Sequence, residues 1–161
     1  MAKECDHLSV GVIIEKDEKI ALLRRANFPI AISPPAGHVD GHGSLEQTAV
    51  DEVFEELGLI VPVEGLINTD IVNRRVENKC QRIGGDHHSW TVYRATDFGG
   101  NLNPSPDETR GAGWYDKKQY EILANRTRQM REGILTPEEW RQNPGLEEVW
   151  LGFLSELGYI N

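Results

Sequence analysis

The sequence predicts an α/β fold, because strand-like and helix-like segments follow one another along its 161 residues. Leu8–Ile14 places Leu, Val, Val and Ile at alternate positions, as a half-buried strand does. Leu45–Leu57 instead repeats apolar residues at the one-, three- and four-residue steps of an amphipathic helix. Residues 117–161 are predicted to be mainly helical. A chain of this length commonly forms one domain, so we expect residues 1–161 to be a single domain.

The N-terminal part predicts a β-hairpin. The polar turn Lys16–Lys19 separates the strand Leu8–Ile14 from a second apolar run, Ile20–Leu23. Arg24 and Arg25 end this second strand, and two interpretations of them remain open. They are surface residues that aid solubility, or Arg25 binds a phosphate, since a guanidinium can bind phosphate oxygens through two hydrogen bonds.

The stretch Gly37–Leu59 carries the clearest functional signal. Ser44, three residues before Gln47, is expected to cap a helix, and Gly58 is placed to end it. Three glutamates at i, i+3 and i+4 share one face of this helix: Glu52, Glu55 and Glu56. Like charges at this spacing destabilise an isolated helix by roughly a few tenths of a kcal/mol per pair. The alternative is an ordinary solvated helix face, but clustered carboxylates also suit Mg²⁺, which takes substrate phosphates as further ligands.

This stretch resembles the Nudix box, G-x5-E-x7-R-E-U-x-E-E-x-G-U, in which U is an aliphatic residue. The matching positions are Gly37, Glu52, Val53, Glu55, Glu56, Gly58 and Leu59. Gly43 stands where the family has Glu, and Asp51 stands where it has Arg. The segments SVGVII and LLRR, the Pro-Ala-Gly entry and a later Glu-x5-Trp-Tyr also lie where the family has them. The resemblance implies an α/β/α sandwich with a mixed sheet, followed here by extra C-terminal helices.

The resemblance also implies an activity. Nudix hydrolases use a divalent ion, Mg²⁺ or Mn²⁺, to cleave the diphosphate linkage of a nucleoside diphosphate derivative or nucleoside triphosphate by water attack at phosphorus. The implied metal ligands are the carbonyl of Gly37 and the carboxylates of Glu52, Glu55 and Glu56. The implied base is Glu55, Glu56 or the later Glu108, with Asp107 as a fallback and a solvated loop carboxylate as the alternative for Glu108. Such metals lower the pKa of a bound water and orient it for attack.

Two histidines flank the turn before the helix. We expect His38 to contact phosphate or another part of the substrate, and His42 to be a solvent-exposed loop residue. Phe28–Ile32 is expected to run as a strand into the turn at Pro34-Pro35.

The two departures from the box leave a second function open. Asp51 adds negative charge where the family has an arginine that orients the box glutamates, and Gly43 removes an outer carboxylate. Asp51 either binds metal or pairs with a lysine from elsewhere. A non-catalytic sensor that keeps the fold and binds nucleotide without cleaving it is therefore the alternative function.

A long polar segment, Asn73–His88, lies between stretches expected to be strands: Ile60–Val63 and Gly65–Val72 before it and Trp90–Ala95 after it. Loops of this length in compact domains are often functional. One hypothesis is a substrate-specificity loop in which three arginines face an anionic ligand: Arg74, Arg75 and Arg82. The other is a zinc site, for which five residues offer the ligand types that zinc prefers: Cys5, His7, Cys80, His87 and His88. If the zinc site is correct, a third function is open: an interaction protein stabilised by zinc.

The C-terminal part predicts three helices. They are Lys117–Arg131, a helix that starts at Thr136-Pro137, and Glu147–Leu157. Their large apolar residues are expected to pack against this end of the fold or to form a homodimer surface: Trp140, Trp150 and Phe153.

Composition restricts the partners and the compartment. A net charge of −9 argues against broad binding to nucleic acid, which needs a basic surface. No apolar run is long enough to cross a membrane, and MAKECDHLSV lacks the layout of a secretory signal. The 2 cysteines are too few for a disulfide framework. We therefore expect a cytoplasmic protein that acts on a small phosphorylated substrate.

Overall fold

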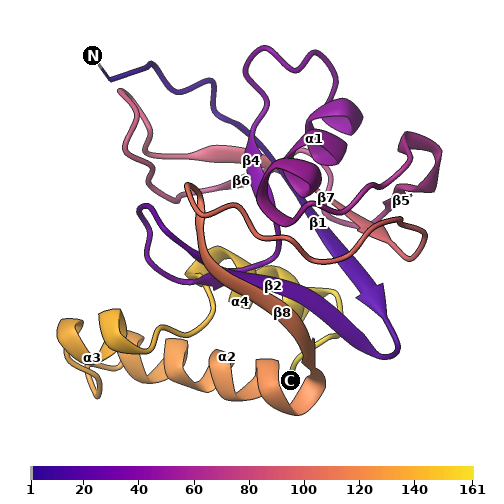
Figure 1. The fold of residues 1–161 in the computed structure, drawn as a ribbon. Coiled ribbons are helices and arrows are strands. Elements are labelled where there is room, and N and C mark those ends of the chain that lie inside the picture. The colour runs from indigo at the N-terminus through magenta and orange to yellow at the C-terminus, as the bar shows by residue number, and fades with distance from the viewer. Residues whose placement is uncertain (1) are drawn as a thin grey trace.

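A mixed β-sheet forms the centre of the structure, a computed structural model that describes residues 2–161 (Figure 1). Its central strand, β1 (Leu8–Lys16), pairs in parallel with β7 (His88–Ala95) and antiparallel with β2 (Lys19–Arg25) and β4 (Ala36–His38). The strands farther out are β3 (Ile32–Ser33) and β8 (Thr109–Asp116) beside β2, and β5 (Ile67–Asn68) and β6 (Arg74–Val76) beside β7. The predicted hairpin of β1 and β2 and the predicted strand at β7 are confirmed.

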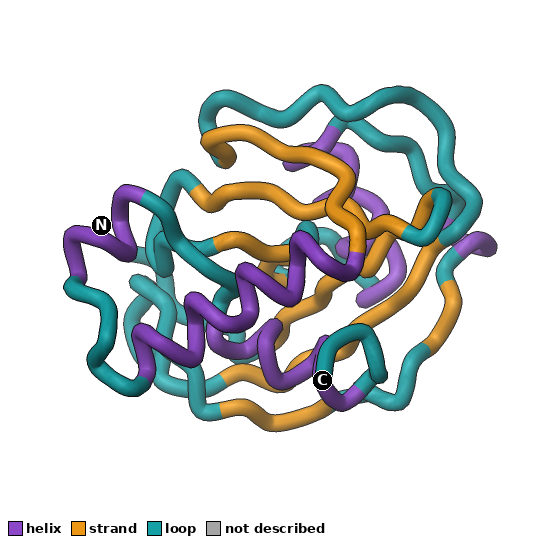
Figure 2. Tube along the Cα trace, turned by 90° about the horizontal axis from the view of Figure 1, so that it is seen from below, coloured by secondary structure: helices purple, strands orange, loops and turns teal. Residues whose placement is uncertain are grey.

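Helices cover both faces of this sheet. On one face lies α1 (Leu45–Leu57), and on the other lie α2 (Lys117–Arg131) and α4 (Glu148–Glu156), with α3 (Pro137–Gln142) between them in sequence (Figures 1 and 2). A short 3-10 helix, Val63–Gly65, follows α1. This arrangement confirms the predicted α/β/α sandwich with a mixed sheet. Within residues 2–161, the helices are too short or too polar for any of them to cross a membrane.

Strand β1 separates the two apolar cores. Val10, Val12 and Ile14 are buried on the side of α1, whereas Ile13 is buried on the side of α4, where it joins Trp150. Gly11 faces the same side as Trp150, and a Cβ on Gly11 would lie 2.3 Å from the indole ring. A glycine at this position therefore lets the largest fully buried side chain rest directly on the sheet.

Two regions contain less strand than the sequence predicted. Residues 60–72 form the 3-10 helix and the two-residue β5, because Pro62 lacks the N–H that a strand ladder needs and Ile60 and Val72 are exposed. The predicted strand Phe28–Ile32 is likewise wrong for most of its length. Phe28 is exposed and strand structure begins only at Ile32.

The C-terminal helices match the prediction closely. Helix α2 has the predicted bounds, and α3 begins with Thr136 as its cap and Pro137 in its first turn. Trp150 and Phe153 are buried in the core, while the indole N–H of Trp140 donates to the carbonyl of Ile30 at 2.7 Å. These three residues therefore have the predicted packing role.

Candidate active site

Helix α1 positions the carboxylates of the site. The hydroxyl of Ser44 accepts a hydrogen bond from the backbone N–H of Gln47 at 3.0 Å, as a helix cap does. At the other end Gly58 has a φ of 72°, a left-handed conformation that glycine adopts at little cost. Both predicted helix ends are confirmed, so the register of the glutamates on α1 is fixed locally.

The glutamates of α1 differ in their surroundings. Glu55 is exposed, Glu52 is half-buried, and Glu56 is only 6% exposed. The carboxylate of Glu56 accepts a hydrogen bond from the backbone N–H of Ala36 at 2.8 Å, which ties α1 to β4. Glu52 rests against Gly37, where an added Cβ would lie 2.3 Å from the carboxylate carbon. Because Gly37 has no side chain, it leaves the space that the carboxylate of Glu52 occupies.

Burial and nearby negative charge raise the pKa values of Glu52, Glu56 and Glu108. Burial first, and then the nearby charges of Glu56 and Glu55, raise the pKa of Glu52 to about 9. Burial also raises the pKa of Glu56 to about 8, against the opposing effect of its bond to Ala36. Glu108, next to Glu55, also has a raised pKa because it is partly buried near like charge. A bound cation would oppose both effects and favour the ionised carboxylates.

The donor atoms present fit a hard divalent ion. His42, Glu52 and Glu55 each offer a ligand atom, and these atoms all lie within 4.8 Å of one another. Carboxylate oxygens are the ligands that Mg²⁺ and Mn²⁺ prefer. These three side chains therefore suit the divalent-metal chemistry that the sequence predicts.

His42 has a different position from the one the sequence predicted. Its side chain is only 24% exposed, and its Nδ1 lies 2.8 Å from a carboxylate oxygen of Asp51. Its Nε2 lies 3.8 Å from Glu52. Asp51 also accepts a hydrogen bond from Gln47 at 2.7 Å, so the pairing with a lysine is replaced by a pairing with a histidine. An imidazole thus stands between Asp51 and Glu52.

A cavity of about 440 Å³ opens beside the carboxylates. Its lining includes Glu52 and Glu56 together with three of the other predicted site residues, Arg25, His38 and Glu108. Arg25 donates to the carbonyls of Pro29 and Phe28, at 3.1 and 3.3 Å, so backbone contacts hold its guanidinium in the wall. Glu55, which is exposed, lies outside this lining.

The three arginines of the long loop have separate positions. Arg74 forms a two-pronged pair with Glu156, and Arg75 pairs with Glu77, both away from the cavity. Arg82 lines the cavity and forms a two-pronged pair with Asp40, at 2.6 and 2.8 Å. The loop therefore does border the cavity, but its arginines do not gather there.

Glu147 is a cavity residue that the sequence did not reveal. It precedes α4, is 8% exposed, and lines the same cavity as Glu52. Its Oε2 is buried without a hydrogen-bond partner among residues 2–161, and lies 4.0 Å from Arg25. Burial raises the pKa of Glu147, and Arg25 opposes that rise. An acidic residue before a helix is ordinary in any sequence, so no local signal distinguished it.

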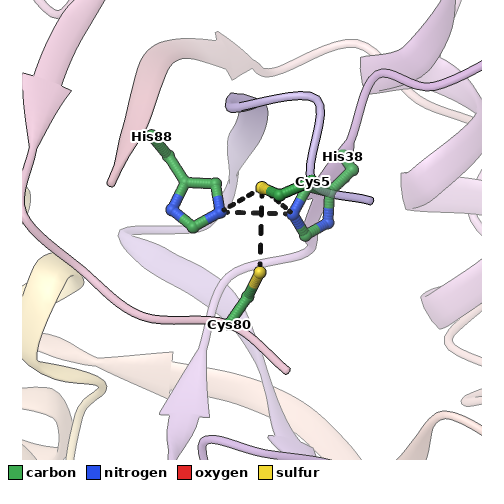
Figure 3. Close-up of side chains that lie close together, drawn as sticks. All are labelled: Cys5, His38, Cys80 and His88. Atoms are coloured by element: carbon green, nitrogen blue, oxygen red, sulfur yellow. Dashed lines mark hydrogen bonds between the residues drawn. The ribbon is translucent and has the colours of Figure 1, made fainter. Parts of the chain in front are cut away.

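Cysteine and histidine side chains form a cluster (Figure 3), three members of which line the same cavity: His38, Cys80 and His88. Its members are Cys5, His38, Cys80 and His88. The predicted zinc set is therefore divided. His7 and His87 stack on each other, with ring centroids 4.1 Å apart, and group with Asp86 instead. His38, expected to contact substrate, takes a place in the cluster.

Helices on both faces of a mixed sheet, with a cavity lined by Glu52 and Glu56 of α1, define the Nudix class of fold. The NUDIX domain family matches residues 6–136 of the chain. The chain therefore belongs to the NUDIX domain family.

Similar proteins agree with this assignment. An ADP-ribose pyrophosphatase of Methanocaldococcus jannaschii is 31% identical over 119 residues, which are 73% of this chain and 66% of that relative. The MutT NUDIX hydrolase of Burkholderia pseudomallei is 25% identical with a TM-score of 0.58, over 70% of this chain and 84% of that chain. A NUDIX family hydrolase of Clostridium perfringens is 17% identical with a TM-score of 0.57, over 94% of both chains, and shows the shared fold alone.

Proposed function

We propose that the protein is a divalent-metal-dependent pyrophosphohydrolase that cleaves the diphosphate linkage of a nucleoside diphosphate derivative. The observation that carries this proposal is the half-buried Glu52 and the buried Glu56, which both line a cavity large enough for a phosphorylated ligand. The similarity to an ADP-ribose pyrophosphatase supports this substrate class, because ADP-ribose is such a derivative. Nucleoside triphosphates contain the same linkage and are the second substrate class.

The residues of the site have three proposed roles: to hold the metal ion, to position the phosphate and to transfer a proton. The carbonyl of Gly37 and the carboxylates of Glu52, Glu55 and Glu56 would hold Mg²⁺ or Mn²⁺. When bound, the ion neutralises phosphate charge and lowers the pKa of water. Arg25 lies in the cavity wall, where its charge favours a phosphate.

Glu108 is the favoured general base. It lines the cavity and is exposed enough to exchange protons with water, and its raised pKa makes the carboxylate a stronger base than an ordinary glutamate. Glu55 is the second candidate, since it is exposed beside the same site. Glu56 is less suited to this role, because the N–H of Ala36 occupies its carboxylate in a buried position.

A second cavity offers a place for the organic part of the substrate. It has a volume of about 400 Å³, shares Phe28, Pro29 and Glu147 with the carboxylate cavity, and is bordered by Trp140 and Val149. Apolar and aromatic walls beside a few polar groups are typical of small-molecule sites. A base or sugar that enters this cavity would leave the diphosphate near Glu52. Such a substrate, and the free thiols of Cys5 and Cys80, agree with a cytoplasmic protein.

The test is hydrolysis of ADP-ribose, nucleoside diphosphate sugars and nucleoside triphosphates, each with and without Mg²⁺ or Mn²⁺. We expect metal-dependent release of a nucleoside monophosphate from at least one diphosphate derivative. Binding of nucleotide without cleavage of any substrate would instead support the non-catalytic sensor.

His42 is expected to act as a positioning residue. Its ring connects Asp51 to Glu52, so His42→Ala should raise the Mg²⁺ concentration needed for half-maximal activity and lower kcat/KM roughly 10- to 100-fold. Asp51→Asn, which keeps an acceptor for the imidazole, should have a smaller effect. Titration of activity with Mg²⁺ measures both changes. An unchanged Mg²⁺ dependence in His42→Ala would show that the imidazole does not position the site.

A further inference from the structure

We infer that Cys5, His38, Cys80 and His88 bind one Zn²⁺ ion at a site separate from the carboxylates of α1. The four ligand atoms all lie within 4.8 Å of one another, and their side chains converge on a common centre (Figure 3). Two thiolates and two imidazoles form a Cys₂His₂ set, which is common in structural zinc sites. The inference does not depend on the hydrolase activity proposed above.

Four of the six distances between the ligand atoms match the edges of a zinc tetrahedron, and the two from Cys80 Sγ to the histidine nitrogens are within 4.8 Å. With Zn–N near 2.0–2.1 Å and Zn–S near 2.3 Å, ideal edges are about 3.3 Å for N to N, about 3.8 Å for S to S and about 3.5 Å for S to N. The Nε2 atoms of His38 and His88 are 3.2 Å apart. The sulfurs of Cys5 and Cys80 are 3.8 Å apart. Cys5 Sγ lies 3.7 Å from His38 Nε2 and 3.3 Å from His88 Nε2, so these four edges have the expected lengths.

Neighbouring groups orient the ligands toward the centre. Nδ1 of His88 lies 3.1 Å from both the backbone carbonyl and the side-chain oxygen of Asn78, so Nδ1 carries the proton and Nε2 offers its lone pair. The same Asn78 oxygen accepts from the indole of Trp90 at 3.2 Å, which fixes the amide as an acceptor. The thiol sulfur of Cys5 accepts the backbone N–H of His7 at 3.3 Å.

The backbone around Cys80 is shaped to present its sulfur. The N–H of Cys80 donates to the carbonyl of Gly85 at 2.9 Å, which closes a turn. A Cβ on Gly85 would lie 2.2 Å from Cys80 Sγ, so a side chain at Gly85 would displace the sulfur. The N-terminal segment is also fixed to this turn, because the N–H of Cys5 donates to the carbonyl of Ile83 at 2.9 Å.

Ligand type distinguishes this site from the carboxylate site. Thiolate sulfur selects Zn²⁺ over Mg²⁺, whereas carboxylate oxygens suit Mg²⁺. Four protein ligands complete a tetrahedron and leave no position for water or substrate, so the role is structural. Two thiolates also cancel the charge of the ion, so the site adds no net charge that would attract phosphate.

The zinc would hold the cavity loop in place. It would join the N-terminal segment at Cys5, β4 at His38, the loop at Cys80 and the start of β7 at His88. Lys79 and Gln81, the two neighbours of Cys80, line the carboxylate cavity. A single ion would therefore fix both neighbours in the wall of that cavity.

The test is the metal content of protein purified without chelator. We expect one zinc per chain in the unaltered protein and a substantial loss of zinc in Cys80→Ser. His87→Gln is the control and should retain zinc, because His87 is next to the ligand His88 in sequence but lies outside the cluster. Replacement of zinc by Co²⁺ in the unaltered chain should give the visible bands of a tetrahedral site and a sulfur-to-metal charge-transfer band.

A second experiment uses the unaltered chain and does not depend on variants. A thiol reagent should react with both cysteines only after a zinc chelator is added, so a Cys80→Ser protein that fails to fold does not decide the matter. Three results would overturn the inference. They are the absence of zinc and of tetrahedral cobalt bands, loss of zinc in His87→Gln equal to that in Cys80→Ser, or a Cys5–Cys80 disulfide in the purified protein.

Discussion

Glu56→Gln should lower kcat/KM for hydrolysis roughly 10³-fold, because metal-bound charge stabilisation is worth several kcal/mol and each 1.4 kcal/mol is tenfold. The amide oxygen of Gln can still accept the hydrogen bond from Ala36, so the contact between α1 and β4 should persist. Steady-state kinetics with Mg²⁺, beside circular dichroism and a melting curve, measures both parts of this expectation. Glu55→Gln should also reduce hydrolysis strongly.

Glu64→Gln is the control for this change. Glu64 is an exposed residue of the 3-10 helix and does not line the carboxylate cavity, so the same substitution there should leave kcat/KM unchanged. Rates like those of the unaltered protein in both Glu55→Gln and Glu56→Gln would contradict the metal roles.

Gly37→Ala is the second change with a large expected effect. The new methyl group would lie 2.3–2.6 Å from the three carboxylate atoms of Glu52, so this side chain must move. A displacement of about 1 Å at a catalytic group can reduce the rate roughly 10²-fold. We therefore expect kcat/KM to fall by about that factor and the metal requirement to rise.

Gly41→Ala is the matched control. It lies in the turn that follows β4, four residues after Gly37, and an added Cβ there would have no neighbour within 4 Å among the described residues. We expect its activity to stay close to that of the unaltered protein. If both alanine variants lost activity equally, a loss of backbone freedom in residues 37–41 and not the contact with Glu52 would be the cause.

The sequence predicted the elements whose signals are local. Ser44 and Gly58 mark the ends of α1 by their own capping chemistry, and Thr136 and Pro137 mark the start of α3 in the same way. Residues 60–72 were predicted less well. Their apolar residues indicated strand, but Ile60 and Val72 are exposed. Only Ile67 and Asn68 pair with the distant strand β7, and such long-range pairing is not visible in the local sequence.

The candidate site was predictable where one element supplies it and less so where several do. The spacing of Glu52, Glu55 and Glu56 on α1 could be read directly from the sequence. The contacts of His42 with Asp51 and of His38 with His88 depend on how loops meet in three dimensions. The position of Glu147 in the cavity wall depends on how α4 packs against the sheet.

The pairing of β4 with β1 has a consequence for the accuracy of folding. β4 is a strand of 3 residues, in which Gly37 is opposite Val10 and His38 is opposite Ser9. Adjacent residues of a strand point to opposite faces, so a slip of one residue would exchange the faces of Gly37 and His38. Both candidate metal sites would be lost in one such misalignment. The bond from Ala36 to Glu56 opposes it, because that bond forms only in the correct register.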